Sequence, residues 1–524
     1  MAVRLHLDGR VWNRRAFLSA SVGALAAWPV LGRPASAMFR TRAVAADYPF
    51  AIGVASGDPT PDGFVIWTRL APKPLDGGGM PHENLQVRWQ VADDESFTKI
   101  AAEGTAVATP ELAHSVHVEV PGLEANRWFH YRFMFGDAES PTGRARTAPA
   151  ADAAPNGLKL AFASCQHFES GYYTAYKHMV DDQPDLIAHL GDYIYEGPGK
   201  STAFRTHVGP LLRELTDYRN RHAQYKTDEQ LQAAHAHCPW LVTWDDHEFA
   251  NNCAGAISEK PDDDPTSYLF RRAAAYQAYY EHMPLRRSQL PHGPDMTLYR
   301  NVKFGRLAEF NILDTRQYRS DQPCGDGNKP PCDEVYDPKR TLLGDEQEQW
   351  LYRRLGESPA TWNVLTQQIM IARVDRKAGD EIGYSMDQWP GYEASRQRLL
   401  KFFAEHPKLN SVAVAGDIHC NWANNLQVDS SVESSPVVAA EFVGTSISSG
   451  GDGGEQRKDT PQMLTENPFV KFFNDERGYV TCEFTPQTCT ARYRTVPFVS
   501  KPDAPINTRA TFVVEAGKPG LQKS

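Results

Sequence analysis

The chain has 524 residues and a formal charge of −10, with 41% hydrophobic and 23% charged residues. The acidic balance argues against a general nucleic-acid binder and against an anchor to anionic membranes, because both need a basic surface. The composition is that of a globular protein, and the length exceeds what one hydrophobic core usually serves, so we expect two domains.

The first 45 residues have the features of an export signal. A twin arginine at 14–15 precedes an apolar run over 18–31, which is shorter than the ~20 residues that a spanning helix needs. Small residues offer cleavage after Ala37 or Ala45. We interpret residues 1–45 as a Tat signal peptide, with an ordinary Sec signal or an uncleaved anchor as the alternatives.

This interpretation implies a route and a location. The Tat machinery would be a partner, and it carries folded proteins, which suits a protein that acquires metal before export. Without residues 1–45 the formal charge is −16. We expect a monomer in the periplasm or secreted medium, with no stable membrane anchor and no nucleic-acid partner.

Residues 46–150 follow a period of two. Apolar and polar residues alternate over 85–91, 116–120 and 129–133, Gly and Pro separate these runs, and there is no helical stripe. The pattern predicts a small N-terminal β-sandwich of immunoglobulin or fibronectin-III type. The Ala- and Pro-rich stretch at 148–155 is the expected linker.

From residue 156 to 524 short strand-like runs alternate with helical ones, which predicts a layered α/β domain. Ligands of such a domain bind beyond the carboxyl ends of its strands. We expect Asp345 and Glu348 to form a capping pair at a helix start. The expected strands cover 158–164, 185–190, 240–244, 307–313, 363–370, 412–415 and 437–443, and the expected helices cover 265–282, 345–356 and 392–405.

Eight cysteines fit an exported chain in which some pair. Cys324 and Cys332 bracket a loop rich in Gly, Pro and Asn, and we expect a local disulfide there. Cys482 and Cys489 flank the tip of an apparent hairpin and could face each other across it. The other four are Cys238 and Cys253, which could pair, and Cys165 and Cys420, which are candidate free or metal-bound thiols.

Polar, metal-capable side chains follow six of the expected strands. A single Asp-His pair is more often a cap or a solvated loop than a ligand set. Burying so many carboxylates together would cost several kcal/mol each unless cations compensated them, so the sequence predicts a polynuclear metal site. The clusters are Ser164–His167, Gly191–Glu196, Asp245–Glu248 with Asn251 and Asn252, Asp314–Arg316, Gln367-Gln368 and Gly416–His419.

The donor types constrain the metals. Asp, Asn and Gln oxygens suit hard cations such as Ca²⁺, Mg²⁺ or Mn²⁺. A thiolate, a phenolate and an imidazole together suit a more Lewis-acidic ion such as Fe³⁺. The mixture predicts a hetero-metal centre, which fits two cations about 3.5–4 Å apart that hold the attacking and leaving oxygens of a phosphoryl transfer.

Several of these motifs resemble a known family. Gly191–Tyr195 has the Gly-Asp-x-x-Tyr form of purple acid phosphatases, where a later Gly-Asn-His and a Gly-His-x-His complete the site. Here those places read Asp245–His247 and Gly416–His419, and Cys165 stands where an early Asp would be. With Gly53–Pro59, Glu441–Ser446 and the Tat signal, the chain resembles the PhoD-type alkaline phosphatases/phosphodiesterases, within the calcineurin-like metallophosphoesterases.

The resemblance implies a fold and a metal content. The fold would be a four-layer α/β metallophosphoesterase sandwich, two β-sheets flanked by helices, after the N-terminal β-sandwich. One Fe³⁺ would be joined by one or two Ca²⁺. His167 stands where the wider superfamily has a ligand, and its role is left open. Carried over, Cys165, Asp192, Tyr195 and His419 would hold iron, and Asp192 would bridge to calcium with Asp246, Asp417 and Gln368 (or Gln367), while Asn252 would serve a further Ca²⁺.

The expected mechanism needs no covalent intermediate. A metal-bound hydroxide would attack phosphorus in line. His247 would hydrogen-bond the phosphoryl group or protonate the leaving alkoxide. Arg316 would clamp the equatorial oxygens, or else form a salt bridge to Asp314 or Asp321. The serines at 446–449 are expected to be loop or substrate contacts, because they lack the spacing of a nucleophile elbow.

The predicted function is an exported, metal-dependent phosphoesterase that hydrolyses phosphomonoesters and phosphodiesters. A phospholipase D-type phosphodiesterase on the same scaffold is the first alternative, since loops such as 197–235 and 255–300 would select the leaving group. A calcium-stabilised extracellular binding protein is the second. That alternative gives no role to a thiolate, a phenolate and two histidines at strand ends.

Overall fold

The structure is a computed structural model that describes residues 5–7, 10–12, 47–200, 203–432 and 434–524. The chain divides into two units, residues 1–40 and 41–524. In the first unit, β1 (Leu5–Leu7) pairs antiparallel with β2 (Arg10–Trp12). The twin arginine, the apolar run and both cleavage sites of the predicted signal lie outside the described residues. Among those described, no helix has the length and apolar character to cross a bilayer.

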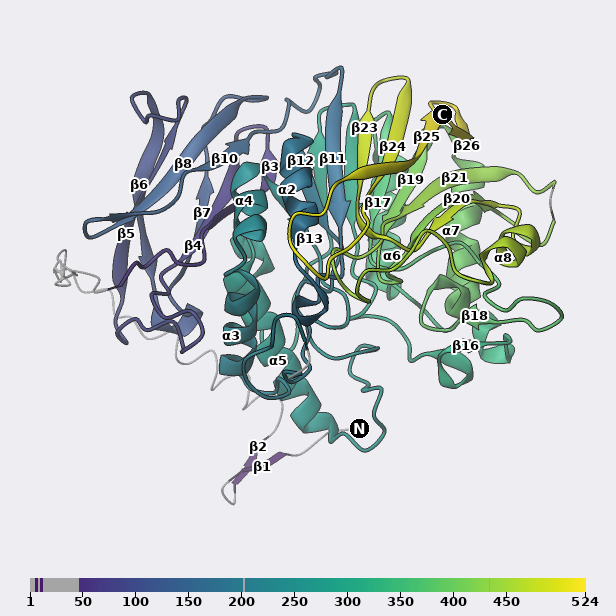
Figure 1. Cartoon of the computed structure of the whole chain (residues 1–524), viewed down its shortest axis with the longest axis horizontal. Helices are drawn as coiled ribbons and strands as arrows, with labels where there is room; N and C mark the ends of the chain where they lie inside the picture. Colours follow the sequence, from purple (N-terminus) through teal and green to yellow (C-terminus); the bar gives the residue numbers. More distant parts are fainter. Residues whose placement is uncertain (1–4, 8–9, 13–46, 201–202, 433) are drawn as a thin grey trace. The chain divides into compact units, whose positions relative to one another are not determined.

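Two large β-sheets form the centre of the second unit (Figure 1). The ten-stranded sheet has the order β26 (Lys518–Lys523), β25 (Asn507–Glu515), β24 (Thr488–Val496), β23 (Arg477–Phe484), β11 (Leu158–Ala163), β12 (Leu186–His189), β13 (Trp240–Val242), β3 (Val54–Thr60), β4 (Gly63–Arg69) and β7 (Ser115–Val120). The seven-stranded sheet has the order β14 (Arg300–Phe304), β15 (Ala308–Ile312), β17 (Trp362–Thr366), β19 (Ser411–Ala415), β21 (Val437–Val443), β20 (Asn421–Gln427) and β22 (Val470–Asn474).

The central strands are buried on both faces. In β11, Leu160 and Phe162 belong to the apolar cluster between the two sheets, whereas Ala161 and Ala163 pack with the outer helices. Successive side chains of a strand point to opposite faces, so one strand serves two cores. This explains why these strands read as nearly continuous apolar runs.

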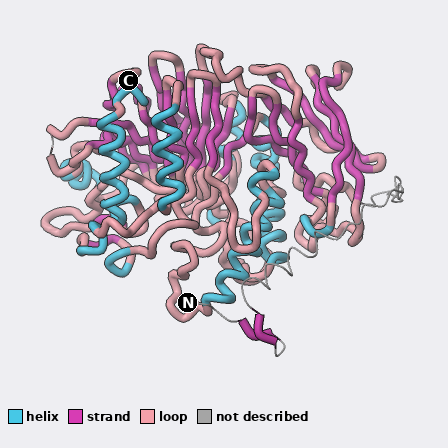
Figure 2. The backbone as a smooth tube through the Cα atoms, turned by 180° about the vertical axis from the view of Figure 1, so that it is seen from behind, coloured by secondary structure: helices cyan, strands magenta, loops and turns pink. Residues whose placement is uncertain are grey.

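Helices cover the outer faces of both sheets (Figure 2). Those on the ten-stranded sheet are α2 (Thr174–Asp181), α3 (Leu215–Tyr225), α4 (Glu229–His237) and α5 (Pro265–His282). Those on the seven-stranded sheet are α6 (Asp345–Glu357) and α7 (Glu393–Glu405). The order helices, sheet, sheet, helices confirms the predicted four-layer α/β sandwich.

One local prediction is wrong. Helix α6 has Gly344 as its N-cap, and no side chain caps it. Glu348 does not fold back onto the helix start. Its carboxylate instead accepts hydrogen bonds from Arg398 of α7, at 2.6 and 2.8 Å. An ion pair to the neighbouring helix therefore replaces the predicted cap.

The N-terminal strands form the predicted β-sandwich. A five-stranded sheet has the order β10 (Gly143–Arg146), β8 (Trp128–Phe135), β5 (Leu85–Ala92) and β6 (Ile100–Ala108), with β9 (Ala138–Glu139) beside β8. Its inward side chains, such as Val87 and Phe133, share one core with Phe64 and Ile66 of β4. The opposing sheet of the sandwich is thus made of β3, β4 and β7.

Those three strands also extend the ten-stranded sheet. Strand β3 pairs in parallel with β13, where Gly57 lies opposite Trp240. A Cβ atom on Gly57 would lie 2.5 Å from the carbonyl oxygen of Pro284, so only glycine fits there. The expected linker is also packed, since Arg306 donates its backbone N–H to Ala153. The sandwich shares a sheet with the rest of the unit, and the boundary at residue 150 stays a prediction.

The cysteines agree with the sequence in part. Cys324 and Cys332 form the expected disulfide. Cys482 and Cys489 are buried free thiols. The β23–β24 ladder sets Cys482 opposite Ala491 and Cys489 opposite Phe484, so the two cysteines are diagonal neighbours on one face, and their thiols contact each other without forming a disulfide. Cys238, Cys253, Cys165 and Cys420 are also buried and free.

Candidate metal centre

The candidate ligands meet beyond the carboxyl ends of parallel strands of both sheets, where the two sheets lie together. Cys165 follows β11, Asp192 follows β12, Asp246 follows β13 and Asp417 follows β19. The first three strands belong to the ten-stranded sheet and β19 to the seven-stranded sheet. Parallel strands place their carboxyl ends on one edge, which is why residues far apart in sequence converge.

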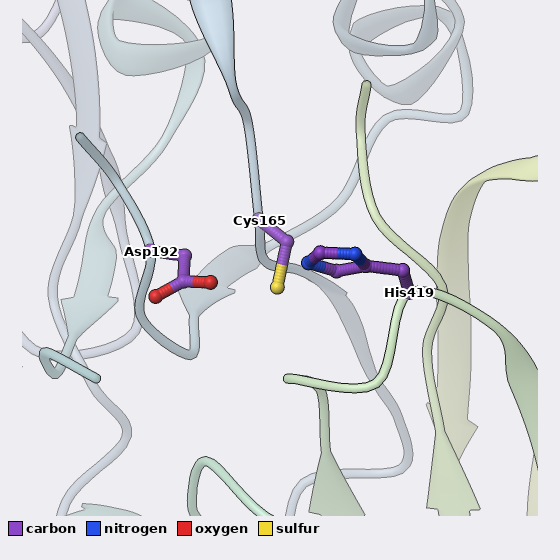
Figure 3. A group of neighbouring side chains, drawn as sticks. All are labelled: Cys165, Asp192 and His419. Atoms are coloured by element: carbon purple, nitrogen blue, oxygen red, sulfur yellow. The ribbon is translucent and has the colours of Figure 1, made fainter. Parts of the chain in front are cut away.

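The four donors expected for iron lie together. Cys165, Asp192 and His419 each offer one ligand atom, and these atoms lie within 4.8 Å of one another (Figure 3). The hydroxyl of Tyr195 donates to Oδ2 of Asp192 at 2.8 Å and lies 3.2 Å from Nε2 of His419. A thiol, a carboxylate, a phenol and an imidazole therefore surround one point.

Two more groups adjoin this one. Asp192, Asp246 and His247 form the second, and Asp245, Asp246 and Asp417 form the third, each with ligand atoms within 4.8 Å of one another. Asp192 and Asp246 each belong to two groups, so the three groups are contiguous. Asp245 has a place here that the sequence analysis did not assign.

Many of the candidate ligands have left-handed backbone. Left-handed backbone is costly for residues other than glycine and persists where the surroundings enforce it, often at functional sites. The φ angles are 58° at Cys165, 54° at Asp192, 49° at Asn252, 66° at Asp417 and 57° at His419.

Glu248 holds two of the ligand loops together. Its buried carboxylate accepts the backbone N–H groups of Asp192 at 3.0 Å, Tyr193 at 2.7 Å and Asp245 at 2.9 Å. Burial raises the pKa of Glu248 to about 7. Gly191 allows the loops to approach, because a Cβ there would lie 2.4 Å from that of Asp245. The sequence placed Glu248 in a polar cluster but gave no sign of this bridging role.

The carboxylates of the centre lack enough protein partners. Burial raises the pKa of Asp192, Asp245 and Asp417. Oδ1 of Asp192 and Oδ2 of Asp245 are buried and make no hydrogen bond within the described part of the chain. An unpaired buried carboxylate oxygen is costly, and a bound cation would relieve that cost. This donor set therefore fits cations.

Burial also affects the other donors of the first group. Burial, with the nearby Asp192 carboxylate, raises the pKa of the Cys165 thiol. Burial and the guanidinium of Arg477 lower the pKa of His419 to about 3, so its imidazole is neutral. A neutral imidazole is the form that binds metal, whereas a thiol must lose its proton to do so.

Arg316 is buried among carboxylates. Its Nη1 lies 2.9 Å from both oxygens of Asp387, its Nη2 lies 3.2 Å from Oδ1 of Asp417, and its Nε donates to Asp245. Burial lowers the pKa of Arg316, but Asp245 and Asp387 outweigh it and the pKa is raised. The guanidinium thus joins ligand-bearing loops of both sheets.

The alternative salt bridges expected for Arg316 do not form. Arg316 reaches Asp314 only with its backbone N–H, at 3.0 Å, and the Asp314 carboxylate accepts further bonds from Gln317. Among the described residues, Asp321 makes no ion pair with the Arg316 side chain. A clamp on phosphate oxygens would require the guanidinium to exchange one of its carboxylate partners, and that role stays a prediction.

His247 lies at the edge of the second group. Its Nδ1 is 2.7 Å from Oε2 of Glu196, and its ring centroid is 4.2 Å from that of Tyr195. Burial alone lowers the pKa of His247, but Asp246 and Asp192 outweigh it and the pKa is raised. Glu196 occupies Nδ1, which leaves Nε2 for a further partner.

The two candidate glutamines are buried in the scaffold. Oε1 of Gln368 accepts from the hydroxyl and the backbone N–H of Thr315, and its Nε2 donates to Thr243 at 2.7 Å. Gln367 accepts from the indole N–H of Trp389 at 2.8 Å. Both amides are thus hydrogen-bonded within the scaffold, and because Thr315 donates twice to Oε1 of Gln368, a ligand role for Gln368 would require one of those bonds to break.

A third glutamine reaches the centre instead. Gln388 donates to Oδ2 of Asp417 at 2.7 Å. Asn252 donates its backbone N–H to Asp246 and its side-chain amide to Asp326, both at 2.6 Å. The sequence analysis missed Gln388 and Asp326, because neither follows a strand of the two large sheets.

His167 and the serine loop have distinct places. The His167 ring packs edge-on against Tyr195, with ring centroids 4.5 Å apart. Its ligand atom lies near those of Glu169 and His207, and His167 is not a member of the group that contains Cys165. Ser449 donates to the carbonyl oxygen of Cys165 and contacts the Tyr195 hydroxyl, both at 2.7 Å. Ser449 is therefore a loop contact that holds a candidate ligand.

Comparisons with known proteins agree with this geometry. Residues 160–493 match the family profile of the PhoD-like phosphatases, and residues 35–149 match that of the PhoD-like phosphatase N-terminal domain. Over 481 residues the chain is 56% identical to alkaline phosphatase D of Bacillus subtilis (strain 168), which covers 91% of this chain and 82% of the relative. A solved structure of PhoD matches with a TM-score of 0.89 and 55% identity, covering 91% of this chain and 92% of that one.

Proposed function

This chain belongs to the PhoD-like phosphatase family, and we infer that it is a phosphoric ester hydrolase that acts on phosphomonoesters and phosphodiesters. We also propose that it is exported by the Tat route. The single observation that carries the mechanism is the contiguity of the three ligand groups through Asp192 and Asp246.

Two kinds of cation fit the three groups. Cys165, Asp192, Tyr195 and His419 supply soft and hard donors together, which suits Fe³⁺. The carboxylates of the second and third groups suit Ca²⁺. When bound, such cations polarise the phosphoryl group and lower the pKa of the attacking water. The proposed ligand set is Cys165, Asp192, Tyr195, Asp246, Asn252, Asp417 and His419, with either Gln368 or Gln388 as the amide.

Gln388 is a second amide candidate for the calcium side. Its Nε2 donates to Asp417 and its Oε1 accepts from Arg376, so its amide would have to turn over to offer an oxygen to a cation, whereas the amide of Gln368 is held by Thr315 and Thr243. The calcium content of Gln388→Leu and Gln368→Leu variants distinguishes the two. We expect the larger loss in Gln388→Leu.

His247 supplies the proton to the leaving oxygen. The Glu196 carboxylate accepts from Nδ1 and would stabilise the protonated ring, which leaves Nε2 to carry the transferable proton. Arg316 holds the loops of Asp245 and Asp417 in place. The guanidinium of Arg316 can contact phosphate only if one of these ion pairs breaks.

Metal dependence tests the reaction. Asp192→Asn removes the charge shared by two groups, and we expect the rates on p-nitrophenyl phosphate and bis(p-nitrophenyl) phosphate to fall at least about 1,000-fold, equivalent to ~4 kcal/mol. Asp262→Asn, at an exposed position, is the matched control. Full activity in a folded Asp192→Asn protein would refute the proposal. The rate on phosphatidylcholine relative to that on p-nitrophenyl phosphate tests the phospholipase D-type alternative, which requires the faster rate on the lipid.

Colour and export test the finer assignments. A phenolate bound to Fe³⁺ absorbs visible light, so Tyr195→Phe should lose the colour of the purified protein. Colourless active enzyme without iron would reject the iron assignment and leave the reaction class intact. Replacement of Arg14 and Arg15 by Lys should retain the protein in the cytoplasm, and undiminished export would reject the Tat route.

A further inference from the structure

A second group of metal-capable side chains lies beside the candidate centre. Ligand atoms of His167, Glu169 and His207 lie within 4.8 Å of one another. Glu169 belongs to a 3₁₀ turn at Phe168–Ser170, and His207 to the loop that precedes α3. None of the three belongs to the three groups described above, and the mechanism uses none of them.

Two atoms of this group are buried without a hydrogen bond. They are Oε2 of Glu169 and Nδ1 of His207; neither makes a hydrogen bond of ordinary geometry to a described residue, although the backbone of Gly197 lies beside the His207 ring. The two side chains are 2% and 0% exposed, and these atoms lie 3.7 Å apart. That separation is too long for a hydrogen bond, whereas two ligands of one tetrahedral Zn²⁺ lie about 3.3 Å apart.

Neighbouring residues fix the opposite sides of these groups. The hydroxyl of Ser170 lies 2.8 Å from Nδ1 of His167, and that of Tyr225 lies 2.9 Å from Nε2 of His207. Oε1 of Glu169 accepts the backbone N–H groups of Lys200 at 2.7 Å and His207 at 3.0 Å. Metal-binding histidines have such partners on the ring nitrogen that does not bind the ion.

We propose that His167, Glu169 and His207 form a separate site for a divalent transition-metal ion, for which Zn²⁺ is the best match. Two imidazoles and one carboxylate are an established ligand set for zinc. The ion would cross-link the turn after β11 to the loop before α3. The edge contact of His167 with Tyr195 places this cross-link next to the candidate centre. The proposal does not depend on phosphate ester hydrolysis.

The test measures zinc binding to the full chain purified after its own export. Glu169→Gln keeps an amide oxygen for the N–H groups of Lys200 and His207 but replaces the free carboxylate oxygen. We expect one Zn²⁺ per wild-type chain at this site, and an affinity lowered more than about 100-fold in Glu169→Gln and in His207→Gln. His292→Gln, at an exposed position, should bind zinc like the wild type.

Zinc could also enter the main centre, so a further variant separates the two sites. Asp192→Asn disrupts two main-centre groups and should still bind this zinc. The X-ray absorption spectrum of zinc in the wild-type protein should show nitrogen and oxygen neighbours only. Three outcomes overturn the proposal: no bound zinc, unchanged affinity in Glu169→Gln, or a sulfur neighbour, which would place the ion at Cys165. The spectrum decides even where a variant does not fold.

Discussion

Glu196 and His247 form a half-buried pair in which the carboxylate lies 2.7 Å from Nδ1 of the imidazole. Glu196 also accepts the backbone N–H of Asn251 at 3.1 Å, so its own position is fixed. The carboxylate fixes the histidine ring beside Tyr195, with ring centroids 4.2 Å apart, and favours the protonated form of the imidazole. The orientation of the proposed acid is thus built into the fold.

The first prediction concerns leaving groups. Replacing His247 with Asn should lower kcat on alkyl phosphates about 100- to 10,000-fold, because a poor leaving group needs a proton. The loss on p-nitrophenyl phosphate should be much smaller, since that leaving group departs as an anion. Steady-state rates on both substrates check this, with His292→Asn as the exposed control. Equal losses on the two substrates would contradict an acid role.

The second prediction concerns Glu248. In Glu248→Gln one of the two oxygens that accept backbone N–H groups becomes a donor, which leaves buried N–H groups of the ligand loops unpaired. We expect the free energy of unfolding to fall by about 1–3 kcal/mol and the content of bound metal to drop. Urea unfolding and elemental analysis measure both, with exposed Glu405→Gln as the control. Unchanged metal content would show that the bridge does not position ligands.

The third prediction concerns the disulfide. Cys324 and Cys332 close a short loop that contains Asp326, the partner of Asn252. Replacing both cysteines with Ser should lower the free energy of unfolding by about 2.5 kcal/mol, since the unfolded chain gains entropy. Replacing buried, unpaired Cys420 with Ser gives the comparison for a thiol outside any disulfide. A double variant as stable as the wild type would assign the disulfide no stabilising role.

The fourth prediction concerns pH. His189 of β12 is 1% exposed, its Nδ1 accepts the N–H of Gly191, and burial lowers its pKa to about 3. Below the unfolded pKa of about 6.5 the unfolded chain binds a proton that the folded chain rejects, so stability falls as pH falls. The window runs from about pH 6.5 to about 3, with a slope approaching ~1.4 kcal/mol per pH unit.

Urea unfolding between pH 7 and pH 5 measures this slope. His189→Gln has no titrating group at the position, so its slope should be smaller than that of the wild type. The exposed control His292→Gln should keep the wild-type slope. An identical slope in His189→Gln and the wild type would show that this proton is not linked to folding.

Much of the fold could be predicted because periodicity reports burial. The run from Leu158 reads as a strand and is one, and the helix expected at 265–282 has those bounds. Periodicity does not say which sheet a strand joins. Gly57 pairs with Trp240 through a close backbone contact that no pattern of apolar residues encodes, so the continuity of the sandwich with the central sheet was missed.

The sequence by itself determined the kinds of donor and the strand ends that carry them, because residue type and strand polarity are both local properties. It could not determine which neighbours claim each polar group. The amide of Gln368 turns to Thr315, Gln388 takes the place beside Asp417, and Arg316 is held by Asp245 and Asp417, which follow strands of the two different sheets. Only tertiary packing decided these partners, because a hydrogen bond between distant residues depends on which side chains the fold brings within about 3 Å.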